Sequence, residues 1–521
     1  MKITLLLPSL LLILAPCWSL YAQEDMTEVD PAPPSEDQVV PVAEDGEADA
    51  AGPAAESAGG ITDSSDDGEP DGMASSTQDP PELGDIVGPA SSRTEEEELL
   101  AQFRRFKELL ENNSIDEADA VAKRIVELAI RTSGPRSIDT AKALTNLAIV
   151  QHRTEQYDAA IQNYDGAIEI IEDQLDRLDA QLINPLRGLG AAQLANGQPD
   201  QAAATFTRAV HISHVNEGPH NIDQVPILES LAETNLLLGE LDQARNVHEL
   251  IYNLNERYYR TNMLDLVPSL MRRARWQHRT GYYNDERATW RRIIRIIEEK
   301  KGKEDLSLID PYIELGRSYY YIDTTDDSSY APTSSYNAEI YFKRAVRIAE
   351  ENPEATWMHE ADTKLALGDY YVKESSLPSA RRVYSDVWAL LSDGDEKLAH
   401  RARTLEQLNA LVLPEFDQFA GEATRSDLIA SDIDVREGIV TLSFSVSKRG
   451  SVEDVEVIEF RPEDFPEMLR HVERQLRSRL YRPRHQDGEP VDTVDQVLTH
   501  SFYYRVDEME RRRAEQLADE G

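Results

Sequence analysis

Residues 144–170 read LTNLAIVQHRTEQYDAAIQNYDGAIEI, and residues 186–212, which begin 42 positions later, read LRGLGAAQLANGQPDQAAATFTRAVHI. The two stretches place small, aromatic and turn-forming residues at the same spacing. Apolar residues recur in both at intervals of three and four, which is typical of amphipathic helices. The turn signals Gln156-Tyr157 and Gly197-Gln198-Pro199 divide each stretch into two helices. Self-similarity at a fixed spacing predicts a repeat protein.

The same register continues in both directions along the chain. A small residue midway along each second helix recurs at steps of 42, except that Glu286 takes one place and that one step is 52. We attribute the long step to a ten-residue insertion inside residues 321–336, which are polar and rich in turn formers. The small residues let paired helices approach closely, and an aromatic residue four positions later fills the gap to the next hairpin. The repeated positions are Ala118, Ala160, Ala202, Ala244, Glu286, Ala338 and Ala380.

The pattern resembles the tetratricopeptide repeat (TPR), whose usual period is about 34 residues. The longer period of 42 is similar to that of the kinesin-light-chain variety. We therefore predict a mainly α fold in which residues 95–411 form a TPR-like α-solenoid of about seven helical hairpins. A final helix, Glu396 to Leu411, is expected to cap the open end. The resemblance implies a superhelix whose concave face, lined by the first helix of each hairpin, holds peptides or partner helices.

A basic and aromatic cluster falls on the presumed inner face of the fifth and sixth hairpins. In an otherwise acidic chain it would suit an acidic extended peptide. The alternative is that these side chains pair with neighbouring Asp and Glu on a solvated face. His248 and Trp290 occupy packing positions and are expected to be core residues. The candidate groove residues are Arg275, His278, Arg279, Arg317, Tyr320 and Tyr321.

The N-terminal residues contain a predicted targeting segment followed by a predicted linker. Residues 1–22 have one Lys, an apolar run from Ile3 to Ala15 and a small residue, Ala22, which together predict a cleaved signal peptide. The alternatives are a retained membrane anchor and a lipoprotein acceptor at Cys17. Residues 23–94 form a disordered acidic linker, because residues 23–92 contain 19 Asp and Glu and no Lys, Arg or aromatic residue.

Charge and cysteine content exclude several classes of partner and site. The 521-residue chain carries a net charge of −43, which argues against nucleic acid and anionic lipid as partners. Cys17 is the only cysteine, so a mature chain would have neither disulfides nor thiolate metal sites. We find no phosphate-binding loop, zinc-binding helix or nucleophile elbow, and we predict no enzyme activity and no cofactor or metal.

After Pro414 the periodicity changes from helical to alternating. Val440, Leu442, Phe444 and Val446 alternate with polar residues, which predicts a strand with one buried face. Lys448-Arg449-Gly450 makes a turn, and SVEDVEVIEF returns as a second strand. Apolar residues from Phe465 to Leu480 then follow at helical spacing, and a last strand covers about Thr493–Val506. The order is strand, strand, helix, strand, in a small α+β domain over residues 415–506, followed by a charged tail at 507–521.

This domain resembles the C-terminal domain of the TonB energy-transducer family. The matching motifs are Gly438-Ile439-Val440, Phe444-Ser445-Val446, Gly450-Ser451-Val452, Val455, Val457, Phe465, Tyr481-Arg482-Pro483 and Phe502. The family's domain lies in the periplasm and pairs, by strand addition at a sheet edge, with an extended segment of an outer-membrane receptor. The resemblance makes the last strand the candidate pairing strand, with Phe502, Tyr503 and Tyr504. The chain departs from the family by its acidic linker and by PEFDQFAGEATRSD before the first strand, which lacks the usual Pro-x-Tyr-Pro stretch.

Six arginines break the acidity of this domain. They form either a solvated face that pairs with nearby carboxylates or a docking patch for an acidic partner, such as the chain's own linker. They are Arg470, Arg474, Arg477, Arg479, Arg482 and Arg484.

Together these features predict a non-catalytic adaptor in the periplasm of a Gram-negative bacterium. The solenoid would bind one protein and the TonB-like domain another, such as an outer-membrane transport receptor or a TonB-system component. The alternative is a membrane-anchored energy transducer that retains residues 1–22 as a transmembrane helix. A third possibility is a structural protein whose C-terminal domain caps an oligomer.

Overall fold

The computed structural model describes residues 90–321, 338–412 and 434–519. The chain divides into two compact units, Met1–Asn196 and Gly197–Gly521, and each is described by itself. The predicted signal at 1–22, the acidic linker up to residue 89 and the insertion after Tyr321 lie outside the described residues. Within the described ranges, no helix combines the length and apolar character needed to cross a bilayer.

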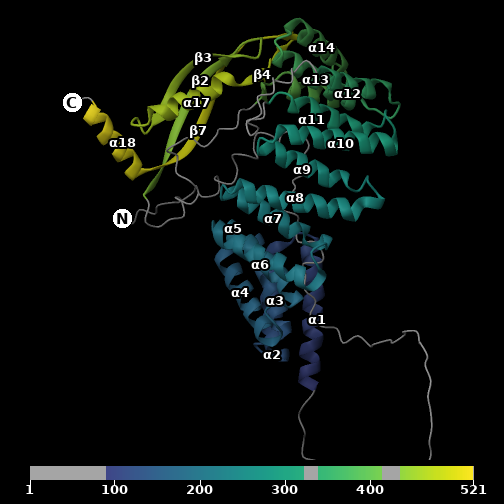
Figure 1. The fold of residues 1–521 in the computed structure, drawn as a ribbon, viewed down its shortest axis with the longest axis vertical. Coiled ribbons are helices and arrows are strands. Elements are labelled where there is room, and N and C mark those ends of the chain that lie inside the picture. The colour runs from purple at the N-terminus through teal and green to yellow at the C-terminus, as the bar shows by residue number, and fades with distance from the viewer. Residues whose placement is uncertain (1–89, 322–337, 413–433, 520–521) are drawn as a thin grey trace, which may run out of the picture. The chain divides into compact units, whose positions relative to one another are not determined.

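The first unit is a run of antiparallel helices in which each helix packs against the next along the chain (Figure 1). Ser137 begins one of them, because its side-chain oxygen accepts a hydrogen bond from the backbone N–H of Thr140 at 3.1 Å. The helices are α1 Ala90–Glu111, α2 Ile115–Ser133, α3 Ile138–Arg153, α4 Tyr157–Gln174 and α5 Ile183–Ala195. Helical structure thus begins slightly before the predicted boundary at residue 95.

The predicted register is visible in the core of the first unit. Ala118 and Ala160, the small residues of the second helices, have no exposed surface. Tyr164 is 2% exposed and lies against Gly188 of α5, where a Cβ atom would overlap the tyrosine ring. An aromatic side chain of one hairpin therefore fills space that a glycine in the next helix leaves open.

The second unit continues the helical hairpins. Pro199 occupies the first turn of α6, where its missing N–H costs nothing. Short 3-10 turns precede α7 and α11. The helices are α6 Pro199–Glu217, α7 Val225–Leu237, α8 Leu241–Tyr258, α9 Val267–Arg279, α10 Tyr283–Lys301, α11 Ile309–Ser318, α12 Glu339–Glu351, α13 Trp357–Lys373, α14 Leu377–Leu390 and α15 Asp395–Thr404.

The predicted turns lie where the helices reverse. Gly239 separates α7 from α8 and Gly281 separates α9 from α10, each with a φ of 77°. This left-handed backbone conformation favours glycine. The chain can therefore end one helix and start the next within three residues.

In the second unit the ring-to-glycine contacts lie within one hairpin instead, and one packing position is a polar exception. Phe342 and Tyr384 are fully buried and lie against Gly316 and Gly368 respectively. At the exception, Glu286 is only 2% exposed, and its carboxylate accepts a hydrogen bond from Trp290 Nε1 at 3.2 Å. Trp290 itself is 4% exposed, as predicted for a core residue.

His248, the other predicted core residue, is half-buried and stacks against Trp276 with 4.0 Å between ring centroids. Burial lowers the pKa of His248 to about 3. The imidazole is therefore neutral at pH 7 and acts as a packing ring.

The expected capping helix from Glu396 to Leu411 is shorter than predicted. α15 ends at Thr404, and the chain then forms β1 Asn409–Val412. The side-chain amide of Asn409 donates to the carbonyl of Thr404 at 3.0 Å, which satisfies a group at the helix end. Leu408 and Ala410 pack against the apolar core of the C-terminal domain instead of continuing the helix.

The C-terminal domain contains a three-stranded antiparallel sheet in the order β3-β2-β7 (Figure 1). Its strands are β2 Val435–Val446, β3 Val452–Arg461 and β7 Thr493–Arg505. The four alternating residues of β2 face α17 Pro466–Ser478, with Phe465, Met468, Val472 and Leu476 in one cluster. The predicted order of strand, strand, helix and strand is therefore present.

Smaller elements complete this domain. β4 Leu480–Arg482 pairs with β1, and β5 His485–Gln486 pairs with β6 Glu489–Pro490. Leu480, which we expected at the end of the helix, belongs to β4. The charged tail forms a helix, α18 Val506–Asp519, whose Met509 joins the domain core.

The close ring-to-glycine contacts generate a stability prediction. Gly368→Ala would place a methyl group inside the ring of Tyr384, so we expect the free energy of unfolding to fall by about 1–3 kcal/mol. Gly166→Ala is the matched control, because a Cβ there meets only Leu144 Cδ1 at 3.7 Å. The control should leave stability unchanged or raise it by up to about 1 kcal/mol. Denaturant unfolding of the full chain measures both, and equal effects would contradict the packing rule.

Candidate protein-interaction surfaces

The predicted inner-face cluster lies on α9, on α11 and directly after α11, but most of its charges are compensated by neighbours. The guanidinium of Arg279 binds Glu233 of α7 through two hydrogen bonds of 2.9 and 3.1 Å. Arg317 binds Glu314 at 2.8 Å on its own helix. Arg275 is exposed and forms no ion pair with the described residues. The structure thus favours the solvated, paired alternative for Arg279 and Arg317, and leaves Arg275 as the exposed cation of the group.

The aromatic members of the cluster pack against one another. His278 lies edge-on to Tyr321, with 4.9 Å between centroids, and Tyr321 stacks on Tyr283 at the same distance. His278 Nδ1 also lies 3.1 Å from the buried carboxylate of Glu286. Tyr320 points elsewhere, since its ring stacks on Phe342, and burial raises its pKa well above the ordinary value. The six predicted residues therefore do not line one surface.

Ion pairs between consecutive hairpins compensate several of the arginines on α9 and α10. Four glutamates of α7 and α8 each pair with one arginine of the following hairpin. These pairs are at least partly exposed, so each contributes little free energy, but together they fix which helices face each other. They are Glu229–Arg272 at 2.9 Å, Glu233–Arg279 at 2.9 Å, Glu249–Arg273 at 2.5 Å and Glu256–Arg292 at 2.7 Å.

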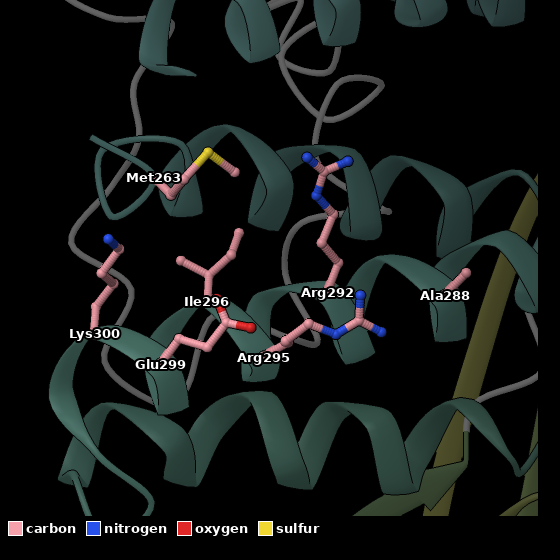
Figure 2. A pocket seen from close by; sticks show the side chains of 7 residues that line it. All are labelled: Met263, Ala288, Arg292, Arg295, Ile296, Glu299 and Lys300. Atoms are coloured by element: carbon pink, nitrogen blue, oxygen red, sulfur yellow. The ribbon is translucent and has the colours of Figure 1, made fainter. Parts of the chain in front are cut away.

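A shallow depression with a volume of about 430 Å³ lies along α10 (Figure 2). Met263 and Ile296 provide apolar surface, and Arg292, Arg295 and Lys300 provide positive charge. Arg292 is already paired with Glu256 and also donates to the hydroxyl of Tyr252. The depression is therefore a weakly cationic, open surface and not an enclosed ligand site.

The predicted docking patch divides into an exposed part and a buried part. Arg470, Arg474 and Arg477 are exposed and lie at intervals of four and three residues, on one face of α17. Arg484 is half-buried. Arg479 and Arg482 are only 5% and 7% exposed, so the prediction that they belong to a surface patch is wrong. The two residues lie at and after the C-terminal end of α17, where the chain turns inward as β4.

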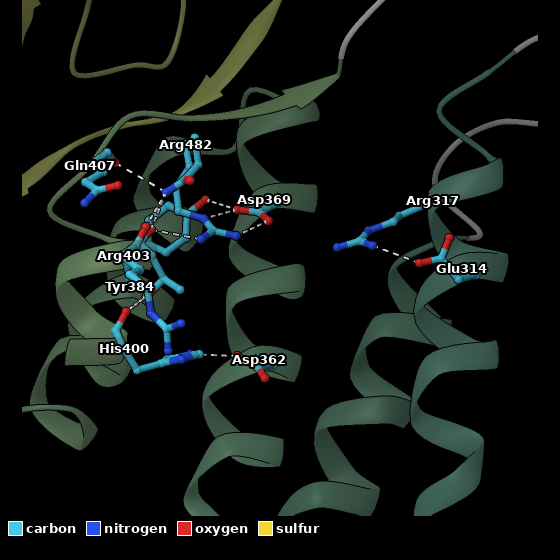
Figure 3. A network of polar contacts seen from close by, with 11 residues as sticks. Glu314, Arg317, Asp362, Asp369, Tyr384, His400, Arg403, Gln407 and Arg482 are labelled. Carbon is cyan, nitrogen blue, oxygen red and sulfur yellow. Dashed lines mark hydrogen bonds and ion pairs between the residues drawn. The ribbon is translucent and has the colours of Figure 1, made fainter. Parts of the chain in front are cut away.

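Arg482 forms the centre of a buried polar network between the C-terminal domain and the last hairpin (Figure 3). Its Nε and Nη2 donate to the two carboxylate oxygens of Asp369 on α13, at 2.8 and 2.7 Å. Asp369 is 7% exposed and also accepts from the hydroxyl of Tyr384 at 2.7 Å. Arg482 Nη1 donates to the carbonyl of Thr404 at 2.9 Å. This bidentate pair joins α13, α14, α15 and β4 at one point.

A histidine lies beside this network. His485 is 1% exposed, and its ring packs edge-on against Tyr384 with 5.2 Å between centroids. Its Nδ1 lies 2.8 Å from the carbonyl oxygen of Pro483, which only accepts, so Nδ1 carries the proton. Burial is the main cause that lowers the pKa of His485 to about 4, and the positive charge of Arg482 acts in the same direction. The ring is therefore neutral at pH 7.

The predicted pairing strand is an edge of the sheet. β7 pairs with β2 along its length and with no other strand among the described residues. Phe502 is 3% exposed and lies over Gly438, where a Cβ would overlap its ring, so Phe502 is a core residue and not a contact for a partner. Tyr503 and Tyr504 are half-buried and lie on opposite faces of the strand.

Little in the amino-acid sequence indicates the Asp369 site. Its one visible signal is an acidic residue inside the otherwise apolar run Leu365–Val372 on a repeat helix. Arg482 is charged and belongs to the Tyr-Arg-Pro motif, but spacing alone does not pair it with a residue 113 positions away.

Comparison with known proteins supports the repeat assignment. Residues 109–173 match the tetratricopeptide repeat family. Repeats of this type suggest a role in protein–protein interaction and generally serve as non-catalytic scaffolds. No curated protein matches the chain.

Several solved structures are similar to the chain at low identity. A TPR repeat-containing protein from Cytophaga hutchinsonii is 12% identical, with 57% of this chain and 98% of that chain covered and a TM-score of 0.36. Putative kinesin light chain TPR-like repeats from Podosopora anserina are 14% identical, with 49% and 97% covered and a TM-score of 0.25. BtubC from P. vanneervenii is 16% identical, with 53% and 91% covered and a TM-score of 0.27.

The buried ion pair generates a second prediction. Arg482→Met leaves the carboxylate of Asp369 buried without its counter-charge, so we expect the free energy of unfolding to fall by about 3–5 kcal/mol. Arg470→Met, at an exposed position of α17, should change it by less than about 1 kcal/mol. Denaturant unfolding measures both, and hydrogen exchange should show the loss concentrated at α13 and β4. A change in Arg482→Met no larger than that of the control would contradict the network.

His485 generates a prediction about pH. Its pKa is about 4 when folded and near 6.5 when unfolded, so the unfolded chain binds the proton more tightly. The stabilising contribution of the neutral ring is complete above about pH 6.5 and is lost as the pH falls toward 4. Between pH 7 and pH 5 we expect a loss of about 2 kcal/mol that His485→Gln abolishes. The carboxylates contribute equally to the pH dependence of both proteins, so the difference between the two proteins isolates the contribution of His485. If the free energy of unfolding depends on pH identically in both proteins, the predicted role of His485 is wrong.

Proposed function

We propose that the chain is a non-catalytic adaptor of the Gram-negative periplasm, in which the repeats bind one protein and the C-terminal domain binds a second. The observation that carries this proposal is the buried Asp369–Arg482 pair. It holds the C-terminal domain to the last hairpin of the second unit.

The resemblance of the C-terminal domain to the TonB family supports the second binding role. The apolar residues that carry the resemblance meet in one cluster, which includes Phe444, Phe465, Tyr481 and Phe502. The strand that the family uses for pairing corresponds to β7, whose outer edge is unpaired among the described residues. Such an edge supplies backbone N–H and C=O groups to an extended peptide.

The location rests on the sequence of residues 1–22 and on the same family resemblance. A cleaved signal would release the chain into the periplasm, where an outer-membrane receptor is within reach. Without a retained anchor, the domain would bind its receptor and transmit no force from an inner-membrane motor. Binding without energy coupling therefore defines the proposed role.

Site-specific photocrosslinking in a Gram-negative host tests this proposal. A photoreactive phenylalanine at Tyr503, on β7, should yield an adduct with an outer-membrane transport receptor, recovered in the outer-membrane fraction and identified by mass spectrometry. The control is the same residue at Lys123, an exposed position of α2 outside the C-terminal domain. Adducts only with further copies of this chain would favour the oligomer-capping alternative, and equal adducts at both positions would reject pairing at β7.

A further inference from the structure

A small apolar crevice lies where the C-terminal domain meets the last hairpin, at the end of the solenoid where α13 contacts β4. Its volume is about 160 Å³, which is below that of typical small-molecule sites but suits one aliphatic side chain. Three segments distant in sequence line it. Its apolar wall consists of Val372, Leu377, Ala380, Tyr384, Pro483 and Pro490.

The β2–β3 turn forms one rim of this crevice and is held in place from several sides. The carbonyl of Gly450 accepts a hydrogen bond from the N–H of Tyr481 at 2.9 Å, and the N–H of Lys448 donates to Asp492 at 2.7 Å. A Cβ at Gly450, whose φ is 83°, would overlap the carbonyl of Tyr481 and lie 3.2 Å from Val372. The turn therefore cannot approach α13 this closely with any other residue, and the positions of Lys448 and Arg449 are fixed.

Positive charge surrounds the mouth of the crevice. Arg381, Lys448 and Arg449 are among its lining residues. Arg381 is paired with Glu489, whereas Lys448 and Arg449 are exposed and form no ion pair with the described residues. His485 in the wall is neutral and packed against Tyr384, so it adds ring surface and no charge. The site combines an apolar pocket with two available cations in a protein whose net charge is −43.

We propose that this crevice binds an acidic segment of a partner protein, with one aliphatic side chain in the apolar pocket and flanking carboxylates on Lys448 and Arg449. An apolar side chain in a fitted pocket, surrounded by complementary charge, is the arrangement that dominates many protein interfaces. A lipid chain or drug-sized molecule would exceed the pocket. The proposal rests on the proposed adaptor role and adds a third surface, separate from β7 and from the inner helices.

The site also joins two parts of the chain, because the pocket exists only while the turn lies against α13 and α14. A segment bound there contacts both and therefore stabilises the docked arrangement by its binding free energy. Partner binding and docking of the C-terminal domain are thus coupled.

Binding of a labelled synthetic peptide to the full chain tests the proposal. The probe is the blocked nonapeptide EDEDLEDED, compared with EDEDSEDED, which lacks the aliphatic side chain, and with QNQNLQNQN, which lacks the charge. We expect measurable binding of the first by fluorescence anisotropy, and at least about tenfold weaker binding of the other two. Equal binding of the leucine and serine peptides would overturn the proposal, since it would show non-specific electrostatic attraction only.

Variants at the site give the second part of the test. The double variant K448E/R449E should weaken binding of EDEDLEDED by about tenfold or more, and Leu377→Ser should weaken it without a change in charge. The matched control is R104E/K107E, which makes the same charge change at exposed positions of α1. Unchanged binding in the site variants, or an equal loss in the control, would reject the crevice.

The result of the peptide-binding experiment is independent of the result of the photocrosslinking experiment at Tyr503. If the peptide fails to bind while the receptor adduct at β7 forms, the crevice is wrong and the adaptor role stands. If the peptide binds and no adduct forms at β7, the pairing role fails and the crevice remains a protein-binding site. Circular dichroism of each variant should match that of the unaltered chain, because Lys448, Arg449, Arg104 and Lys107 are all exposed.

Discussion

The stacking of helical hairpins in this protein depends on one steric constraint, the contact of an aromatic ring with a residue that has little or no side chain. Tyr164 meets Gly188, Phe342 meets Gly316, and Tyr384 meets Gly368. A ring on one helix can reach the neighbouring backbone only where no Cβ intervenes, and this sets the distance between helices. Three such contacts occur among the described repeats, so the same local packing is used at separate places along the chain.

This is the reason why the repeat architecture could be predicted from the sequence. The constraint is local and periodic, so Ala118, Ala160 and Ala380 identify it by spacing alone. The alternating residues of β2 likewise predicted a strand with one buried face, because side-chain direction in a strand has a period of two. Both predictions needed only neighbours within one element.

Contacts between elements that are far apart in sequence could not be predicted from the residue pattern. Shared charge predicts one surface for the arginines of α17 and of the segment after it, but Arg479 and Arg482 turn inward and Arg482 pairs with Asp369. For Arg279 the alternative of pairing with a carboxylate holds, because Glu233, 46 positions earlier in the sequence, binds it. The spacing of residues in the sequence predicts which face of an element a side chain lies on. Whether a charged side chain there is solvent-exposed or paired depends on which residue of another element the fold places beside it.

The short pairing of β1 with β4 would transmit force to the repeats if a bound partner pulled on the sheet. Tension applied along β7 passes through β2 and the tightly packed Gly450 turn to β4, and from β4 into α13 and α15 through Arg482. The load between the sheet and the repeats is then shared by the β1–β4 pairing, the Arg482 guanidinium, the Arg381–Glu489 ion pair and the hydrogen bond from the His485 N–H to the Leu405 carbonyl. A force on β7 therefore reaches the last hairpins through several parallel contacts.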